Sequence, residues 1–122
     1  MSLGTQLVEL CKQGKNREAV ETLYADDIVS IEAHDDGKMP TKYEGKEAVM
    51  GKHDWWENTF EVLEASCDGP FYNEAKDEFM VYFKMKTKNK ETGETCDDAE
   101  VGHYFEKEGK VVKEMFYYGD GN

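Results

Sequence analysis

The chain has 122 residues, a length that fits one domain, residues 1–122, with a single core or a small cavity. Its formal net charge of −12 excludes nucleic acid and anionic membrane surfaces as expected partners, because both require a basic patch. No stretch approaches the ~20 apolar residues of a membrane span. Residues 1–4 give no evidence about the fold or function of the domain.

The cysteines and histidines give no sign of a disulfide framework or a metal site. Three scattered cysteines without a CxxC pair, Cys11, Cys67 and Cys96, are typical of reduced thiols in a cytoplasmic protein. The three histidines lack the spacing of metal ligands. We therefore expect no metal and no cofactor.

Helical periodicity dominates the first half of the chain. The stripe that starts at Leu3 ends before Gly14, and a second helix runs from the capping residue Asn16 to Asp26-Asp27. Residues 28–33 alternate as a strand, and the Gly, Pro and Asp content of residues 34–45 predicts a loop. A third helix is expected from Lys46 to about Phe60.

After the third helix the hydrophobic period changes from 3.6 to 2. Four strands follow: Val62–Tyr72, Glu78–Lys88, Glu94–Lys107 and Lys110–Tyr118. Short turn-forming segments join them as hairpins. The order α-α-β-α-β-β-β-β predicts an α+β domain whose helices pack on one face of a curved antiparallel sheet.

Four segments carry a resemblance to a known family: the element order itself, "LYADDIVSIEA", "YEGKEAV" and the closing "YFEKEGKVVKEMFYY". With them the chain resembles the nuclear transport factor 2-like superfamily, and within it the SnoaL-like branch. The resemblance implies a cone in which a bent sheet wraps a long helix around a mostly apolar pocket. This superfamily includes ketosteroid isomerases and polyketide cyclases along with non-catalytic members, so the fold alone does not settle function.

The closing hairpin offers a first pair of candidate catalytic residues. If Glu108-Gly109 form a two-residue turn, His103 lies directly opposite Glu114. A carboxylate beside an imidazole orients the ring for acid–base work. The pair is equally consistent with a structural role in the sheet, and a three-residue loop with a bulge would separate the two side chains.

Glu32 is the candidate base. By alternation alone, the polar face of the strand that carries Glu32 would be exposed to water. The resemblance implies instead that this face points into the cone. The ketosteroid isomerase pattern has its general-base aspartate seven residues after an alanine, and the seventh residue after Ala25 is Glu32. The same alignment places valines, Val8 and Val101, at the positions of the two oxyanion donors. The polyketide cyclase pattern matches His103 but has Phe116 near its aspartate position.

Aromatic residues are the expected walls of the pocket, which suits a small apolar or aromatic ligand. The candidate ligand-binding residues, each of which is equally typical of core packing, are Trp56, Phe60, Phe83, Phe105, Phe116 and Tyr118. His53, on the Trp56 stripe, is interpreted as a core histidine. A homodimer is expected through an apolar patch on the outer sheet face, namely Tyr82, Tyr104, Met115 and Tyr117.

Two functions follow from these residues. The first is a cofactor-independent lyase, isomerase or cyclase in which Glu32 removes a proton and His103, held by Glu114, relays it. The second is a non-catalytic ligand-binding or dimeric scaffold domain of the same fold. The first requires all three side chains to converge in one cavity.

Overall fold

The computed structural model describes residues 1–33 and 41–118. The described residues form three helices and six strands. The helices are α1 (Leu3–Lys12), α2 (Asn16–Leu23) and α3 (Lys46–Thr59). The strands are β1 (Tyr24–Ile31), β2 (Lys42–Glu44), β3 (Phe60–Tyr72), β4 (Glu78–Asn89), β5 (Thr95–Lys107) and β6 (Lys110–Tyr118).

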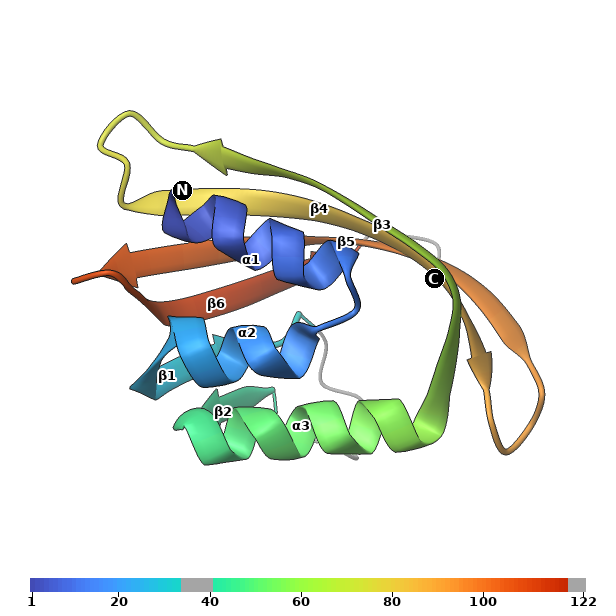
Figure 1. Ribbon diagram of the computed structural model, residues 1–122. Helices are drawn as coiled ribbons and strands as arrows, with labels where there is room; N and C mark the ends of the chain where they lie inside the picture. Colours follow the sequence, from blue (N-terminus) through green and yellow to red (C-terminus); the bar gives the residue numbers. More distant parts are fainter. Residues whose placement is uncertain (34–40, 119–122) are drawn as a thin grey trace.

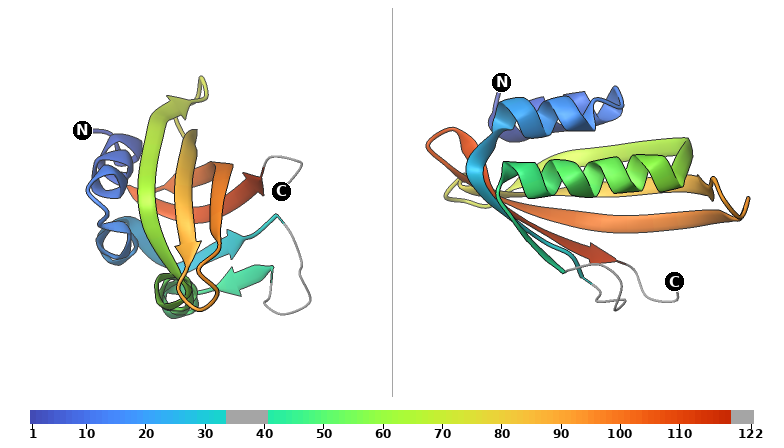
Figure 2. Two further views of the ribbon diagram at one scale, coloured as in Figure 1. Left: turned by 90° about the vertical axis from the view of Figure 1, so that its right-hand side faces the viewer. Right: turned by 90° about the horizontal axis from the view of Figure 1, so that it is seen from below.

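The strands form one sheet in the order β2-β1-β6-β5-β4-β3. Its neighbours are antiparallel except for the parallel pair β1 and β6. Long, bent strands curve the sheet, and all three helices lie on its concave side (Figures 1 and 2). The predicted α+β architecture, with helices on one face of a curved sheet, is therefore confirmed.

Two boundaries differ from the prediction. Strand β1 begins at Tyr24, so Asp26 and Asp27 are exposed strand residues and not the end of a helix. The chain enters β1 directly from α2, because Tyr24 is buried against the core and extends the backbone at once. Part of the expected loop, Lys42–Glu44, is strand β2 paired with β1. Residues 34–40 of that loop lie outside the described residues.

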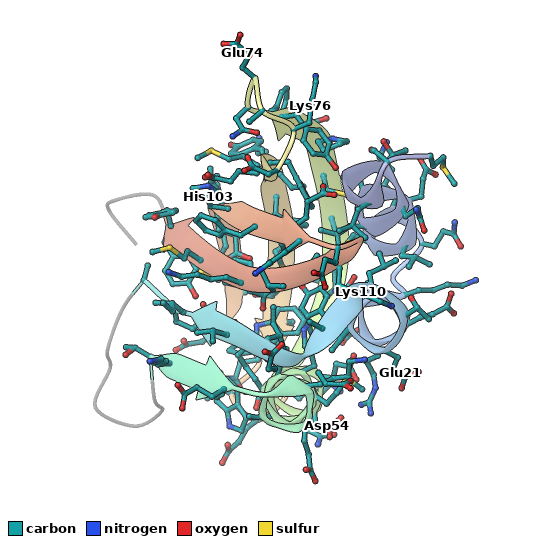
Figure 3. All side chains as sticks on the ribbon, turned by 90° about the vertical axis from the view of Figure 1, so that its left-hand side faces the viewer. Glu21, Asp54, Glu74, Lys76, His103 and Lys110 are labelled. Atoms are coloured by element: carbon teal, nitrogen blue, oxygen red, sulfur yellow. The ribbon has the colours of Figure 1, made fainter. Side chains whose placement is uncertain are left out.

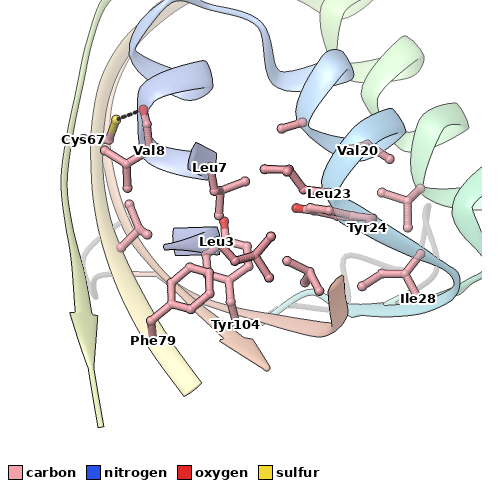
Figure 4. Packing of buried hydrophobic residues seen from close by; sticks show 14 residues of the cluster. Leu3, Leu7, Val8, Val20, Leu23, Tyr24, Ile28, Cys67, Phe79 and Tyr104 are labelled. Carbon is pink, nitrogen blue, oxygen red and sulfur yellow. Dashed lines mark hydrogen bonds between the residues drawn. The ribbon is translucent and has the colours of Figure 1, made fainter. Parts of the chain in front are cut away.

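The main core lies between the first two helices and the inner face of the sheet (Figure 4). Leu7 and Val8 of α1 and Val20 of α2 are almost fully buried there. They meet Phe79 and Tyr104, whose rings stack with centroids 5.1 Å apart. Apolar stripes at helical spacing thus hold α1 and α2 on the sheet. Helix α3 contributes only Val49 to the fully buried set, so most of its inner side is left for a cavity.

A register shift in the closing hairpin decides which side chains face inward. Lys107 pairs with Lys110 and Glu106 with Val111, as the predicted two-residue turn requires. Between Phe105 and Glu106 the register shifts by one residue. Beyond this bulge Tyr104 pairs with Glu114, and His103 pairs with Met115. The predicted pairing of His103 with Glu114 is therefore wrong.

The faces of β5 are also opposite to the prediction. Directly opposed residues share a face, and Tyr104 stacks inward on Phe79. Its neighbours Glu100 and Gly102 therefore face inward too, whereas His103 faces outward. Gly102 makes room for this arrangement, because a Cβ there would lie 2.7 Å from the Tyr104 ring. Burying two large aromatic rings outweighs the apolar flanks that suggested the opposite face.

Candidate functional site

A cavity of about 320 Å³ opens between α3 and the inner faces of β1, β5 and β6. The residues that line it come from both halves of the chain. They are Asn16, Glu32, Lys52, His53, Trp56, Met85, Asp98, Ala99, Glu100, Phe116 and Tyr118. A cavity of this size accommodates a small organic molecule.

Glu32 lies at the end of β1 with its carboxylate in this cavity. Its Oε2 accepts a hydrogen bond of 2.7 Å from the Tyr118 hydroxyl. Its Oε1 lies 3.3 Å from Nζ of Lys52. Burial and the adjacent Glu32 carboxylate raise the pKa of Tyr118 well above its ordinary value, so this hydroxyl remains a donor at neutral pH. Two side chains from different elements therefore fix the Glu32 carboxylate.

Lys52 connects Glu32 to a second, fully buried carboxylate. Nζ of Lys52 donates to Oγ of Ser30 at 2.7 Å, and Ser30 donates to Oε2 of Glu114 at 2.7 Å. Nζ of Lys52 itself lies 3.7 Å from Oε2 of Glu114. The Tyr24 hydroxyl donates to the other oxygen of Glu114. Glu114 is only 1% exposed, so this network compensates for the burial of its charge.

Glu100 is the second carboxyl group that lines the cavity. It lies opposite Phe83, on the inner face of β5. Burial raises the pKa of Glu100 to about 7, with a further contribution from the Glu32 carboxylate. Near neutral pH a large fraction of Glu100 is thus protonated and able to donate a hydrogen bond. Two carboxyl groups in one cavity differ in environment, which is the arrangement that acid–base chemistry needs.

The remaining walls are mainly aromatic and uncharged. Trp56 extends from α3, and Phe116 and Tyr118 extend from β6. Nζ of Lys52 lies 5.0 Å from the centroid of the Phe116 ring, within the range of a cation–π contact. Burial, with Lys52 as the next cause, lowers the pKa of His53 to about 4. His53 is therefore neutral at physiological pH.

Comparison with known proteins identifies the family to which this site belongs. The family model described as a SnoaL-like domain matches residues 2–118, nearly the whole chain. The chain belongs to the SnoaL-like domain family. Among curated proteins, none matches the sequence.

Several solved structures share this SnoaL-like fold. A SnoaL-like polyketide cyclase candidate from Mesorhizobium loti is 40% identical, with 95% of this chain and 96% of that chain covered and a TM-score of 0.87. A computationally designed 17-OHP binder is 22% identical, with 98% and 95% covered and a TM-score of 0.75. A protein with a ketosteroid isomerase-like fold from Catenulispora acidiphila, in complex with trimethylamine, is 14% identical, with 95% and 84% covered and a TM-score of 0.72. The last two similarities show the fold alone.

The three expected catalytic side chains do not converge. Glu32 lines the cavity, and Glu114 lies behind it, joined through Ser30 and Lys52. His103 lies on the outer face of the sheet, where its Nε2 is 2.8 Å from Oε1 of Glu78. Figure 3 shows it on the side of the sheet away from α1 and α2. The relay from Glu32 through His103 to Glu114 is therefore wrong, because the inward packing of Tyr104 leaves its neighbour His103 on the outer face and the hairpin bulge pairs Glu114 with Tyr104.

The expected aromatic walls are found in part. Trp56, Phe116 and Tyr118 line the cavity. Phe60 instead packs against Trp56 with a centroid distance of 5.6 Å, and Phe83 packs against the buried core. Phe105 is not a pocket residue, because it stacks on His103 at 4.3 Å on the outer face.

Sequence reasoning missed Lys52 and Glu100. Lys52 follows the inner stripe of α3, but a lysine on a short helix is normally interpreted as exposed. Glu100 was missed because the apolar residues around His103 suggested the opposite face of β5, and the isomerase pattern placed its neighbour Val101 in the site. Gly102 was the available signal, because a glycine inside a strand often marks the close approach of another group.

The described residues hold no metal-binding group and no membrane-spanning helix. Across residues 1–33 and 41–118, no three His, Cys, Asp or Glu side chains converge as ligands of a metal ion. Within the same ranges no helix has both the length and the apolar character needed to cross a membrane.

Proposed function

We propose that the protein binds a small, largely apolar carbonyl compound in this cavity and transfers a proton within it, as a cofactor-independent isomerase, cyclase or lyase. The observation that carries the proposal is that Glu32 and Glu100 face the same cavity beside the Trp56 indole. One carboxyl group is held by a hydrogen bond from Tyr118 and an ion pair with Lys52, and the pKa of the other is raised to about 7.

In the proposed reaction Glu32 is the base. It removes a proton from the carbon next to the carbonyl group of the ligand, and the electron pair moves to the carbonyl oxygen. Protonated Glu100 donates a hydrogen bond to that oxygen and stabilises its developing charge. Where a carbon–carbon double bond adjoins the deprotonated carbon, the charge extends to the far end of that bond and Glu32 returns the proton there, so the double bond shifts and no net proton is gained or lost. Tyr118 and Lys52 position the base.

The second candidate is a ligand-binding domain without catalysis. Two observations favour it: both oxygens of Glu32 already have side-chain partners, and Val8, at the position of an oxyanion donor in the isomerase pattern, is core. In this alternative Glu32 contributes to binding and to the network around Lys52, and the bound compound leaves unchanged.

A ligand screen distinguishes the two candidates. Flat carbonyl compounds are tested by NMR for shifts of the Trp56 indole, with the exposed Trp55 as an internal control in the same spectrum. Compounds that bind are then assayed for conversion with the wild type and with Glu32→Gln. Conversion that Glu32→Gln loses while binding persists supports the enzyme. Binding without conversion in either protein supports the binder, and a screen without any shift at Trp56 contradicts both.

We also infer a homodimer through the outer sheet face. Tyr82 and Tyr117 are exposed there, at 38% and 46%, on either side of Val101, and Met115 lies two residues before Tyr117 on β6. The expected fourth member, Tyr104, is buried against Phe79 and does not belong to this patch. Sedimentation of Tyr82→Glu tests the inference, because a charge in the patch should give monomers.

Three free thiols support a cytoplasmic location.

A further inference from the structure

We infer that the cavity prefers ligands that carry an organic cation, such as a quaternary or protonated amine, over neutral ligands of the same shape. This inference rests on the proposed function, because it specifies the class of compound that the same cavity takes. It is carried by the charges and the rings around the cavity.

The charges of the lining are unbalanced. Among the described residues the lining holds one lysine, Lys52, against three carboxyl groups, those of Glu32, Asp98 and Glu100. Lys52 is also shared with the buried Glu114 at 3.7 Å. One ammonium group therefore compensates Glu32 and Glu114 together, which leaves the field inside the cavity negative. A cation that enters the cavity neutralises part of this excess negative charge. The site is partly desolvated, so the resulting charge pairs are stronger than in water.

The walls suit the apolar substituents of such a cation. Trp56 supplies the ring type that binds cations best, and Tyr118 lines the same cavity. The Lys52 ammonium itself lies 5.0 Å from the Phe116 centroid and 5.2 Å from the Tyr43 centroid. The chain thus already places a cation against aromatic rings at this site, and a ligand cation would extend the arrangement toward Trp56.

Protonation of Glu100 and binding of the ligand cation oppose each other, because both add positive charge to the same negative region of the cavity. The Glu32 carboxylate, after burial, is the next cause that raises the pKa of Glu100 to about 7. A bound cation opposes this effect and favours the ionised carboxylate, so binding of the cation should release a proton. The charged groups that act on Glu100 come from several elements: Glu32 just after β1, Lys52 of α3, Asp98 of β5 and Glu114 of β6. The titratable side chains of His53 and Tyr118 line the same cavity.

Two soluble probes of nearly equal shape test the inference: choline, which is cationic, and 3,3-dimethylbutan-1-ol, its neutral isostere. Binding is followed through the Trp56 indole, with Trp55 as the internal control. We expect choline to bind about tenfold more tightly than the alcohol at neutral pH. Its affinity should rise several-fold, up to about tenfold, from about pH 6 to about pH 8, and that of the alcohol should not change.

Glu100→Gln is the decisive variant, and Glu64→Gln, an exposed carboxyl group on β3, is its matched control. Glu100→Gln should remove the pH dependence of choline binding, and Glu64→Gln should retain it. Equal affinity for the two probes, or choline binding that does not depend on pH, overturns the inference and leaves the proposed function intact. Failure of choline to shift Trp56 also overturns it when carbonyl compounds from the screen do shift that indole. Absence of any ligand at Trp56 instead contradicts the proposed function itself.

Discussion

Replacing Glu100 with glutamine should stabilise the protein increasingly as the pH rises. In the folded protein the pKa of Glu100 is about 7, above its ordinary value of 4.5. The folded state therefore binds this proton more tightly than the unfolded state does. The resulting stability is fully present below about pH 4.5 and is lost as the pH rises through about 7. Glutamine stays neutral at every pH and avoids this loss.

The size of the effect follows from the two pKa values. At about 1.4 kcal/mol for each pKa unit, the shift corresponds to about 3 kcal/mol in total. About 2.5 kcal/mol of this falls between about pH 5 and about pH 8, since the unfolded glutamate is already mostly ionised at the lower pH. With a urea m-value of about 1.5 kcal/mol/M, the midpoint of Glu100→Gln should move by about 1.7 M relative to the wild type between these two pH values.

Urea unfolding of both proteins across this pH range measures the difference directly. His53, whose pKa is lowered to about 4, gives the wild type a pH dependence of opposite sign, because the unfolded state takes up its proton first as the pH falls. His53 is present in both proteins, so its contribution cancels in the difference. A difference that stays constant from pH 5 to pH 8 would refute the reasoning.

Three further substitutions test the network, the core and the outer face. Lys52→Met should cost about 3 kcal/mol of unfolding free energy, because it removes the cation shared by two carboxylates. Adding Glu114→Gln to this variant should restore part of the lost free energy. A double-mutant cycle in which the two effects simply add would contradict the network. Phe79→Ala should cost about 3–5 kcal/mol through the cavity that it leaves in the core, and a thermal melt that shifts by less than about 5 °C would contradict that assignment. His103→Ala should change the unfolding free energy by less than about 1 kcal/mol and leave ligand binding at Trp56 unchanged; lost binding would place His103 in the site after all.

The fold could be predicted from the sequence because local signals and hydrophobic periods agree with it. The change from period 3.6 to period 2 after the third helix separated helices from strands, and the paired turns set the antiparallel order. Glu32 could be placed in the cavity only through the family resemblance, since the alternation of β1 by itself suggested a solvent-facing residue. Its position in the lining agrees with the resemblance.

The catalytic partners could not be predicted because a bulge in β6 and the inward face of β5 decide them together. The two-residue turn at Glu108-Gly109 was predicted and is present, but the register shift just before it carries no clear local signal. The shift pairs Glu114 with Tyr104 in place of His103. His103 was lost from the site and Glu100 gained because the inner face of β5 is the one that carries Tyr104. The decisive energy, burial of the stacked Tyr104 and Phe79 rings, is tertiary and not local.

The exchange of carbon-bound protons in D₂O is the most direct test of Glu32 as a base in this cavity. Carbonyl compounds that shift the Trp56 indole are incubated with the wild type and with Glu32→Gln, and loss of the proton signal next to the carbonyl group is followed by NMR. We expect the wild type to exchange deuterium into the bound compound and Glu32→Gln to slow this by about 10²-fold or more, while the affinity for the compound changes little. Equal exchange in the two proteins, or none above the rate in buffer, would contradict the assignment.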